Sequence, residues 1–125
     1  MELSKSFAII GAGNGGQAFA AYLSLKGHSV KIYDVSQKTV DILQEKGGVL
    51  LEGNSDVVGF GKIMLASTDL KEVIHGADIV MVVLPSIYHK DMAEKMAPYL
   101  ENGQYVLLNP VAGLGIVEVQ NALKA

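Results

Sequence analysis

The most constraining feature of the sequence is a glycine-rich turn at residues 11–16, which reads Gly-Ala-Gly-Asn-Gly-Gly. It follows the apolar run Phe7–Ile10 and precedes a stretch with apolar residues at helical spacing. These residues are Ala18, Phe19, Tyr22, Leu23 and Leu25. A short apolar run that stops at glycine is typical of a strand buried on both faces. Gly27 then stands where a left-handed helix cap is expected. The pattern predicts a strand, a tight turn and a helix in direct succession.

The same alternation of apolar runs and helical spacing continues along the 125 residues. Further strands are predicted at Val30–Tyr33, Lys62–Ala66, Asp78–Leu84 and Tyr105–Leu108. Glycines interrupt residues 49–65, which predicts a β-rich excursion before the strand at 62–66. Strands that alternate with helices through short connections predict parallel pairing with right-handed crossovers. We therefore predict an α/β fold with a doubly wound, open parallel sheet, in a single domain over residues 1–125.

Helix boundaries give further expectations. Asp69 and Glu72 resemble an N-terminal capping pair for a short helix, and Ser86 stands where it would cap the next one. That second helix carries Met92 and Met96 at helical spacing, so both side chains are predicted to lie in the core. A weaker helical pattern runs from residue 113 to the end of the chain.

The composition excludes several classes of protein. Hydrophobic residues make up 50% of the chain and charged residues 18%, which argues against disorder. A net charge of −3 gives no general attraction to nucleic acid or to anionic membranes. The absence of cysteine excludes disulfides, thiolate nucleophiles and cysteine-based metal sites. The longest apolar run, Ile79–Leu84, is far shorter than the ~20 residues that cross a bilayer. We expect a soluble, cytoplasmic protein that binds neither nucleic acid nor membrane.

The glycine spacing points to a chemistry. Gly11, Gly13 and Gly16 match G-x-G-x-x-G in the strand–turn–helix context that dinucleotide binding requires. The first glycine allows the tight turn, the second lets the backbone approach a pyrophosphate, and the third lets the helix pack against the strand. Free N–H groups and the positive end of the helix dipole attract the dianion, so an acidic chain can bind it locally. The alternative is a merely flexible loop. The predicted cofactor contacts are Gly11, Ala12, Gly13, Asn14, Gly15 and Gly16.

Asp34 ends the second predicted strand, near the distance of ~20 residues from the turn at which an acidic residue binds the ribose hydroxyls. Its carboxylate would repel a 2′-phosphate, and residues 35–38 contain no arginine, so NAD is favoured over NADP. Lys38 could still reach a 2′-phosphate, so NADP stays an alternative. The alternative is that Asp34 only ends its strand or caps the following helix.

Two strand ends complete the predicted site. Leu84 and Pro85 close the fourth predicted strand, and Asn109 and Pro110 close the fifth. Both pairs fall at the carboxyl edge, where ligands bind in open parallel sheets. They are predicted to line the ribose and nicotinamide. The alternative is that the prolines only end their strands, as proline commonly does.

The histidines give no catalytic or metal site. His28 precedes a strand, His75 lies near a helix end, and His89 is expected on a helix surface. No His-x-x-x-His metal spacing and no Gly-x-Ser-x-Gly nucleophile turn occur in the sequence. We predict no catalytic residue and no metal ligand in this chain.

Taken together, these motifs closely resemble the amino-terminal domain of the octopine/nopaline (opine) dehydrogenases. The Gly-Asn-Gly-Gly turn, with the Ala-Phe-Ala-Ala-Tyr-Leu helix that follows it, is more specific than the glycine spacing alone. Glycerol-3-phosphate dehydrogenase and ketopantoate reductase domains are a looser match. The residues that carry the resemblance are 9–23, 26–30, Asp34, 82–85, His89 and 103–110.

The resemblance implies a Rossmann-type NAD(P)-binding domain of an oxidoreductase. In this family the amine of an amino acid adds to a 2-oxo acid, and NAD(P)H reduces the resulting imine. It also implies a second, helical domain that supplies the catalytic residues. We expect that domain to lie outside residues 1–125, so the chain should bind dinucleotide and turn over little substrate. Residues 111–115 depart from the Thr-Gly-Gly element of the family.

Two alternatives stay open. A glycerol-3-phosphate dehydrogenase-like domain would reduce dihydroxyacetone phosphate instead of an imine. A non-catalytic dinucleotide-sensing module would use the bound cofactor to control assembly, for example as a homodimer.

Overall fold

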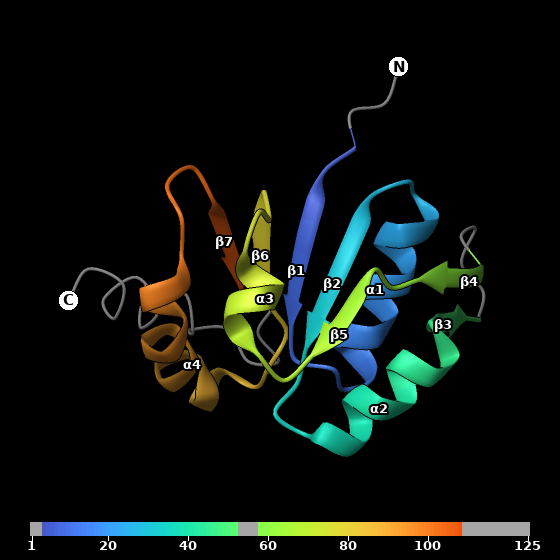
Figure 1. Cartoon of the computed structure of the whole chain (residues 1–125), viewed down its shortest axis with the longest axis horizontal. Helices are drawn as coiled ribbons and strands as arrows, with labels where there is room; N and C mark the ends of the chain where they lie inside the picture. Colours follow the sequence, from blue (N-terminus) through green and yellow to red (C-terminus); the bar gives the residue numbers. More distant parts are fainter. Residues whose placement is uncertain (1–3, 53–57, 109–125) are drawn as a thin grey trace.

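The computed structural model of the chain describes residues 4–52 and 58–108. Five strands form one sheet in the order β5-β2-β1-β6-β7, and every pairing in it is parallel (Figure 1). The strands are β1 (Ser6–Ile10), β2 (Ser29–Tyr33), β5 (Leu65–Ser67), β6 (Ile79–Val82) and β7 (Tyr105–Leu108). The helices are α1 (Asn14–Leu25), α2 (Gln37–Lys46), α3 (Leu70–Ile74) and α4 (His89–Met96), with short 3-10 turns η1 (Ser86–Tyr88) and η2 (Ala97–Tyr99). The predicted doubly wound α/β fold is confirmed.

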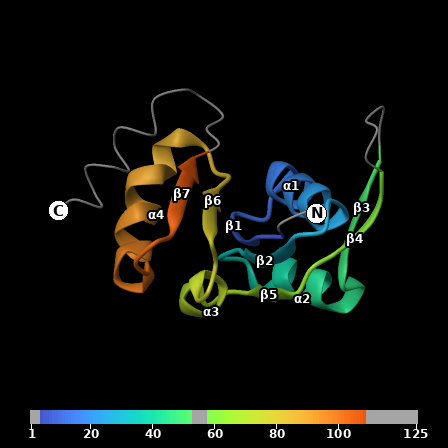
Figure 2. The same ribbon diagram turned by 90° about the horizontal axis from the view of Figure 1, so that it is seen from above.

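The core lies on both faces of the sheet. Alternate residues of β1 point to opposite faces, as the pleat requires. Phe7 and Ile9 pack with residues of α1 and α2, whereas Ala8 and Ile10 pack with residues of α3 and α4. Figure 2 shows α1 and α3 on opposite sides of β1. Because both faces are covered here, β1 reads as a continuous apolar run instead of an alternating one.

The strand order reverses beside β1, and this reversal positions the site. From β1 the chain first builds outward through β2 and β5, then returns to the other side of β1 through β6 and β7. The connections after β1 and after β6 therefore leave the same edge of the sheet in opposite directions. A crevice at such a switch point is where ligands bind in open α/β sheets.

The region between α2 and the third parallel strand differs from the prediction. A β-rich excursion is present, as an antiparallel hairpin of β3 (Gly48–Leu51) and β4 (Gly59–Lys62). The strand predicted at 62–66 is wrong in its bounds, because Lys62 ends β4 and the third parallel strand is β5. The hairpin packs against α1, and a Cβ at Gly61 would lie 2.6 Å from the Cα of Ala21. Such a backbone-to-backbone contact has no signature in apolar spacing.

The helix caps agree with the sequence in part. The Asp69 carboxylate accepts a hydrogen bond from the Lys71 backbone N–H at 2.9 Å, which confirms the predicted cap of α3. Glu72 is no capping partner, since its carboxylate accepts from a serine hydroxyl before the helix. The cap predicted at Ser86 is wrong. Ser86 lies inside η1 and makes no side-chain cap, and α4 begins at His89.

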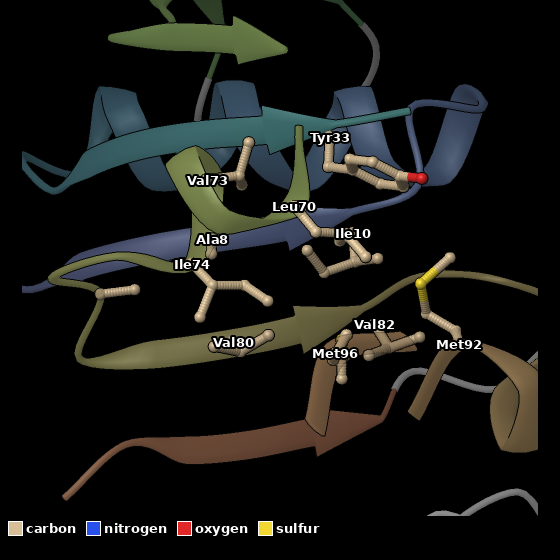
Figure 3. Close-up of a cluster of buried hydrophobic side chains, with 11 residues drawn as sticks. Ala8, Ile10, Tyr33, Leu70, Val73, Ile74, Val80, Val82, Met92 and Met96 are labelled. Atoms are coloured by element: carbon tan, nitrogen blue, oxygen red, sulfur yellow. The ribbon is translucent and has the colours of Figure 1, made fainter. Parts of the chain in front are cut away.

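Helix α4 contains one confirmed and one wrong burial prediction. Met92 and Met96 lie in the core, where Figure 3 shows them beside Val82 of β6. His89, predicted on the surface, is instead fully buried, with 0% of its surface exposed. Its Nε2 lies 2.6 Å from the Leu84 carbonyl oxygen, and this bond compensates for the burial of a polar ring.

Asn109, Pro110 and the helical pattern predicted near the end of the chain lie outside the described residues. Within residues 4–52 and 58–108, no helix is long and apolar enough to cross a membrane. The same ranges contain no cluster of three or more histidine, aspartate or glutamate side chains that could hold a metal ion.

Candidate functional site

The first glycine of the turn is wedged between two strand ends. Gly11 has a left-handed φ of +115°, and its N–H donates to the Tyr33 carbonyl at the end of β2 at 2.8 Å. A Cβ on Gly11 would lie 2.5 Å from the Val83 carbonyl oxygen, just after β6. Both the backbone conformation and the available space therefore require glycine.

The last glycine brings the helix onto the turn. A Cβ on Gly16 would lie 1.8 Å from the Gly11 carbonyl oxygen, a distance that no side chain tolerates. The start of α1 thus lies directly against the end of β1, where a Cβ on Gly16 would also lie 3.6 Å from Ile9 Cγ2, so there is no room for a side chain between helix and strand.

The middle glycine is different, because neither its backbone nor its neighbours require it. Gly13 has an ordinary φ of −76° and extended ψ, and no described atom lies within 4 Å of a Cβ placed there. Gly13, Asn14 and Gly15 are exposed, whereas Gly11, Ala12 and Gly16 are buried. The turn therefore presents an open, side-chain-poor surface at its middle.

This open surface coincides with the start of helix α1. Gly13 is its N-cap, none of the described side chains caps it, and no acidic residue lies in its first turn. The first N–H groups of a helix have no partner within the helix, and they lie at the positive end of its dipole. An exposed helix start without a protein cap is suited to an anion.

Asp34 lies directly against the turn. Its Oδ1 accepts a hydrogen bond from the Ala12 N–H at 2.9 Å, and its Oδ2 accepts one from the Ser36 N–H at 3.0 Å. The cap of α2 is Ser36 itself, whose hydroxyl accepts from Thr39, so Asp34 does not cap that helix. Each carboxylate oxygen has more than one acceptor position. The half-buried Asp34 can therefore hold the turn and still accept hydroxyl groups.

Sequence reasoning overlooked a second side chain that holds the turn. Gln17, in the first turn of α1, donates its side-chain Nε2–H to the Ala12 carbonyl at 2.8 Å. Asp34 accepts a hydrogen bond from the N–H of the same residue, so the N–H and the carbonyl of Ala12 both have side-chain partners. Glutamine is common on helix surfaces, and only the geometry reveals this role.

The remaining predicted contact residues follow β6. The Leu84 side chain lies next to Gly11, since a Cβ there would be 2.9 Å from Leu84 Cδ2. Pro85 follows and precedes η1. The structure thus brings residues 11–16, Asp34, Leu84 and Pro85 to one edge of the sheet, while Asn109 and Pro110 fall outside its described part.

The sequence matches the family described as "NAD-dependent glycerol-3-phosphate dehydrogenase N-terminus" over residues 6–118. The chain belongs to this family. An opine dehydrogenase from Arthrobacter sp. (strain 1C) is 37% identical over 121 residues, or 97% of this chain and 33% of that protein. A glycerol-3-phosphate dehydrogenase [NAD(P)+] from Agathobacter rectalis is 34% identical over 106 residues, or 79% of this chain and 29% of that protein. The chain spans about a third of the length of these relatives.

Solved structures of this kind share the fold. Glycerol-3-phosphate dehydrogenase from Coxiella burnetii superposes with a TM-score of 0.78 at 24% identity, covering 98% of this chain and 38% of that one. Octopine dehydrogenase in complex with NADH and pyruvate gives a TM-score of 0.78 at 16% identity, covering 96% of this chain and 33% of that one. Family membership and fold together confirm the predicted resemblance and the predicted cofactor class, NAD(P).

In this family member, a hollow of about 430 Å³ adjoins the end of β2. Burial raises the pKa of the Tyr33 hydroxyl, the charge of Lys95 opposes that rise, and the Asp34 carboxylate adds to it. No sequence motif pointed to Lys95, because α4 brings it there only through the crossover. The lining residues are Tyr33, Thr68, Asp69, Leu70, Lys95 and Tyr99.

Proposed function

We propose that the chain is the dinucleotide-binding domain of an opine-dehydrogenase-like oxidoreductase, with NAD preferred over NADP. The complete enzyme would join an amino acid to a 2-oxo acid through an imine. When bound, the reduced cofactor supplies the hydride for that reduction. The catalytic residues would come from a separate substrate domain. The complete enzyme would be cytoplasmic.

One observation carries the cofactor part of this proposal: the glycine at position 13. Gly11 and Gly16 are explained by the fold, because a side chain at either would collide with backbone. Gly13 is not, because its φ is ordinary and a Cβ there would meet no atom of the described residues. Nothing in the described part of the fold therefore requires glycine at this position, which favours the requirement of a ligand. A pyrophosphate at the start of α1 would lie there.

The surrounding residues would divide the binding of the cofactor between them. The exposed N–H groups at residues 13–15 would hold the pyrophosphate. Asp34 would accept the adenosine ribose hydroxyls while it keeps Ala12 in place. Leu84 and Pro85, with Asn109 and Pro110, would line the ribose and nicotinamide.

Gly13→Ser tests the pyrophosphate assignment. Serine is at least as good an N-cap as glycine, so the free energy of unfolding should stay the same or rise by about 0.3 kcal/mol. Its Cβ and hydroxyl would occupy the phosphate position, so calorimetry should show at least about tenfold weaker NADH binding. Undiminished binding by this variant would remove the pyrophosphate from the glycine turn.

The preference for an amino acid and a 2-oxo acid rests on the 37% identity to an opine dehydrogenase, which extends over 97% of the chain. The family description and the Agathobacter rectalis relative favour the alternative, a glycerol-3-phosphate dehydrogenase. An assay of the polypeptide that carries this chain separates them. Oxidation of NADH should require both pyruvate and a member of an amino acid panel. Oxidation with dihydroxyacetone phosphate alone would establish the alternative.

A further inference from the structure

His89 combines complete burial with an incomplete set of hydrogen bonds. Its side chain is 0% exposed, and its Nε2 lies 2.6 Å from the Leu84 carbonyl oxygen. Its Nδ1 is the one buried side-chain nitrogen or oxygen, within the described part of the chain, that has no partner. A carbonyl only accepts hydrogen bonds, so the proton of the neutral ring is on Nε2. The imidazole therefore acts here as a donor to the backbone.

This bond closes the segment that joins β6 to α4. Pro85 has no N–H of its own, and the Tyr88 N–H donates to the Pro85 carbonyl at 3.0 Å. The backbone N–H of His89 donates to Ser86, inside the same segment. The imidazole reaches back further, to the carbonyl of Leu84, where the chain leaves the sheet. The His89 side chain, at the end of the connection, thus fixes Leu84 at its start.

The Leu84 end of this connection also packs against the glycine turn at residues 11–16. Val83 continues the sheet by donating its N–H to the Ile10 carbonyl at 2.9 Å. The Val83 carbonyl and the Leu84 side chain then lie where a Cβ of Gly11 would be, at 2.5 Å and 2.9 Å. Not even a methyl group would fit between Gly11 and these atoms, so a rotation of the Leu84 peptide would move the surface against which Gly11 packs.

We propose that His89 is a positioning residue for the dinucleotide, which acts through the Leu84 carbonyl and the turn against which Gly11 packs. The inference rests on the function proposed above and deepens it. Without the imidazole donor, the partly buried Leu84 carbonyl loses its partner, and the peptide rotates to find another. That rotation displaces Leu84 and Pro85 and loosens the glycine turn, so NADH binds less tightly although His89 does not touch it.

Two substitutions at this position separate the hydrogen bond from packing. Gln can place an amide N–H where His89 places its Nε2, whereas Met has a similar size and no donor. Calorimetry with NADH should show about tenfold weaker binding for His89→Met and nearly unchanged binding for His89→Gln. Met96→Ala is the matched control, because it leaves a cavity at a fully buried position of the same helix and removes no side-chain hydrogen bond. It should lower the unfolding midpoint and leave the NADH affinity unchanged.

Two NMR measurements make the inference independent of the variants' stability and of the cofactor. In the wild-type chain, a long-range ¹H–¹⁵N spectrum should show the His89 proton on Nε2, with slow exchange. The Gly11 backbone amide should shift in His89→Met and keep its position in His89→Gln and Met96→Ala. Equal NADH affinities for His89→Met and the wild type would overturn the inference, as would an equal loss in Met96→Ala or a proton on Nδ1. A wild-type chain that fails to bind NADH would instead overturn the proposed function, and the Gly11 amide would still decide whether His89 controls the turn.

Discussion

The two edges of the parallel sheet differ in how completely their polar groups are paired. At the amino edge, polar groups pair with one another: Asp78 accepts from the Ser6 N–H at 2.8 Å, and Glu101 bonds His75 at 2.9 Å. At the carboxyl edge, the start of α1 has no side-chain cap from the described residues, and Gly13 faces open space. An edge whose groups satisfy each other stabilises the fold. At the carboxyl edge, Asp34 and Gln17 hold the turn through such pairs, while the helix start beside them, which no described side chain caps, is prepared for a ligand.

The largest effect is expected where the carboxyl edge is most crowded. Gly16→Ala would place a Cβ 1.8 Å from the Gly11 carbonyl oxygen, and only a backbone shift could relieve the collision. We expect the free energy of unfolding to fall by about 3 kcal/mol or more, measured by urea denaturation. Gly13→Ala is the matched control and should cost less than about 1 kcal/mol. Equal losses in the two variants would show that these glycines do not have separate roles.

The next largest effect is expected at Asp34, which serves both the turn and the proposed ribose site. Asp34→Ala removes the acceptor of the Ala12 and Ser36 N–H groups together with the ribose contact. NADH binding should weaken about tenfold or more, and NADPH binding should weaken less, because the repulsion of the 2′-phosphate is also lost.

Asp34→Asn separates these contributions. It keeps one acceptor oxygen and removes the charge, so it should narrow the NADH preference with a smaller loss of NADH affinity. Competition titrations with both cofactors would measure the ratio. A ratio that does not change in either variant would remove Asp34 from cofactor selection.

The carboxyl edge could be predicted from the sequence only in part. Strand ends and the glycine turn are local patterns, so residues 11–16, Asp34 and Leu84 were predicted where the structure brings them together. The role of Gln17 and the burial of His89 depend on which backbone carbonyl lies opposite each side chain. That information comes from tertiary contacts, and a polar residue type alone predicts exposure. The packing of the β3–β4 hairpin on α1 could not be predicted for the same reason, because this contact is between backbone atoms.

At the amino edge, Gln104 should matter for stability alone. Its Nε2 donates to the carbonyls of Ile74 and Ala77 at 2.8 and 3.0 Å, and its Oε1 accepts from the Glu101 N–H at 2.8 Å. Gln104→Ala leaves partly buried carbonyls without this donor and should cost about 1–2 kcal/mol in thermal or urea unfolding. NADH affinity should not change. A loss of affinity at constant fold would mean that the two edges are coupled and that the contrast between them is wrong.

The smallest effect is expected from Glu101, on the surface of the same edge. Hydrogen bonds from the Gly76 N–H and from His75 hold the pKa of this carboxyl below its ordinary value of 4.5. Because the folded protein binds this proton less tightly than the unfolded chain, the contribution to stability is fully present above pH 4.5 and is lost as the pH falls through the lower folded pKa. The difference in unfolding free energy between the wild type and Glu101→Gln should therefore shrink as the pH falls below 4.5. Glu101 is exposed, so the difference should be small at every pH and smaller still at high salt. A difference that stays constant under acid would mean that the carboxylate charge does not contribute to closing the amino edge.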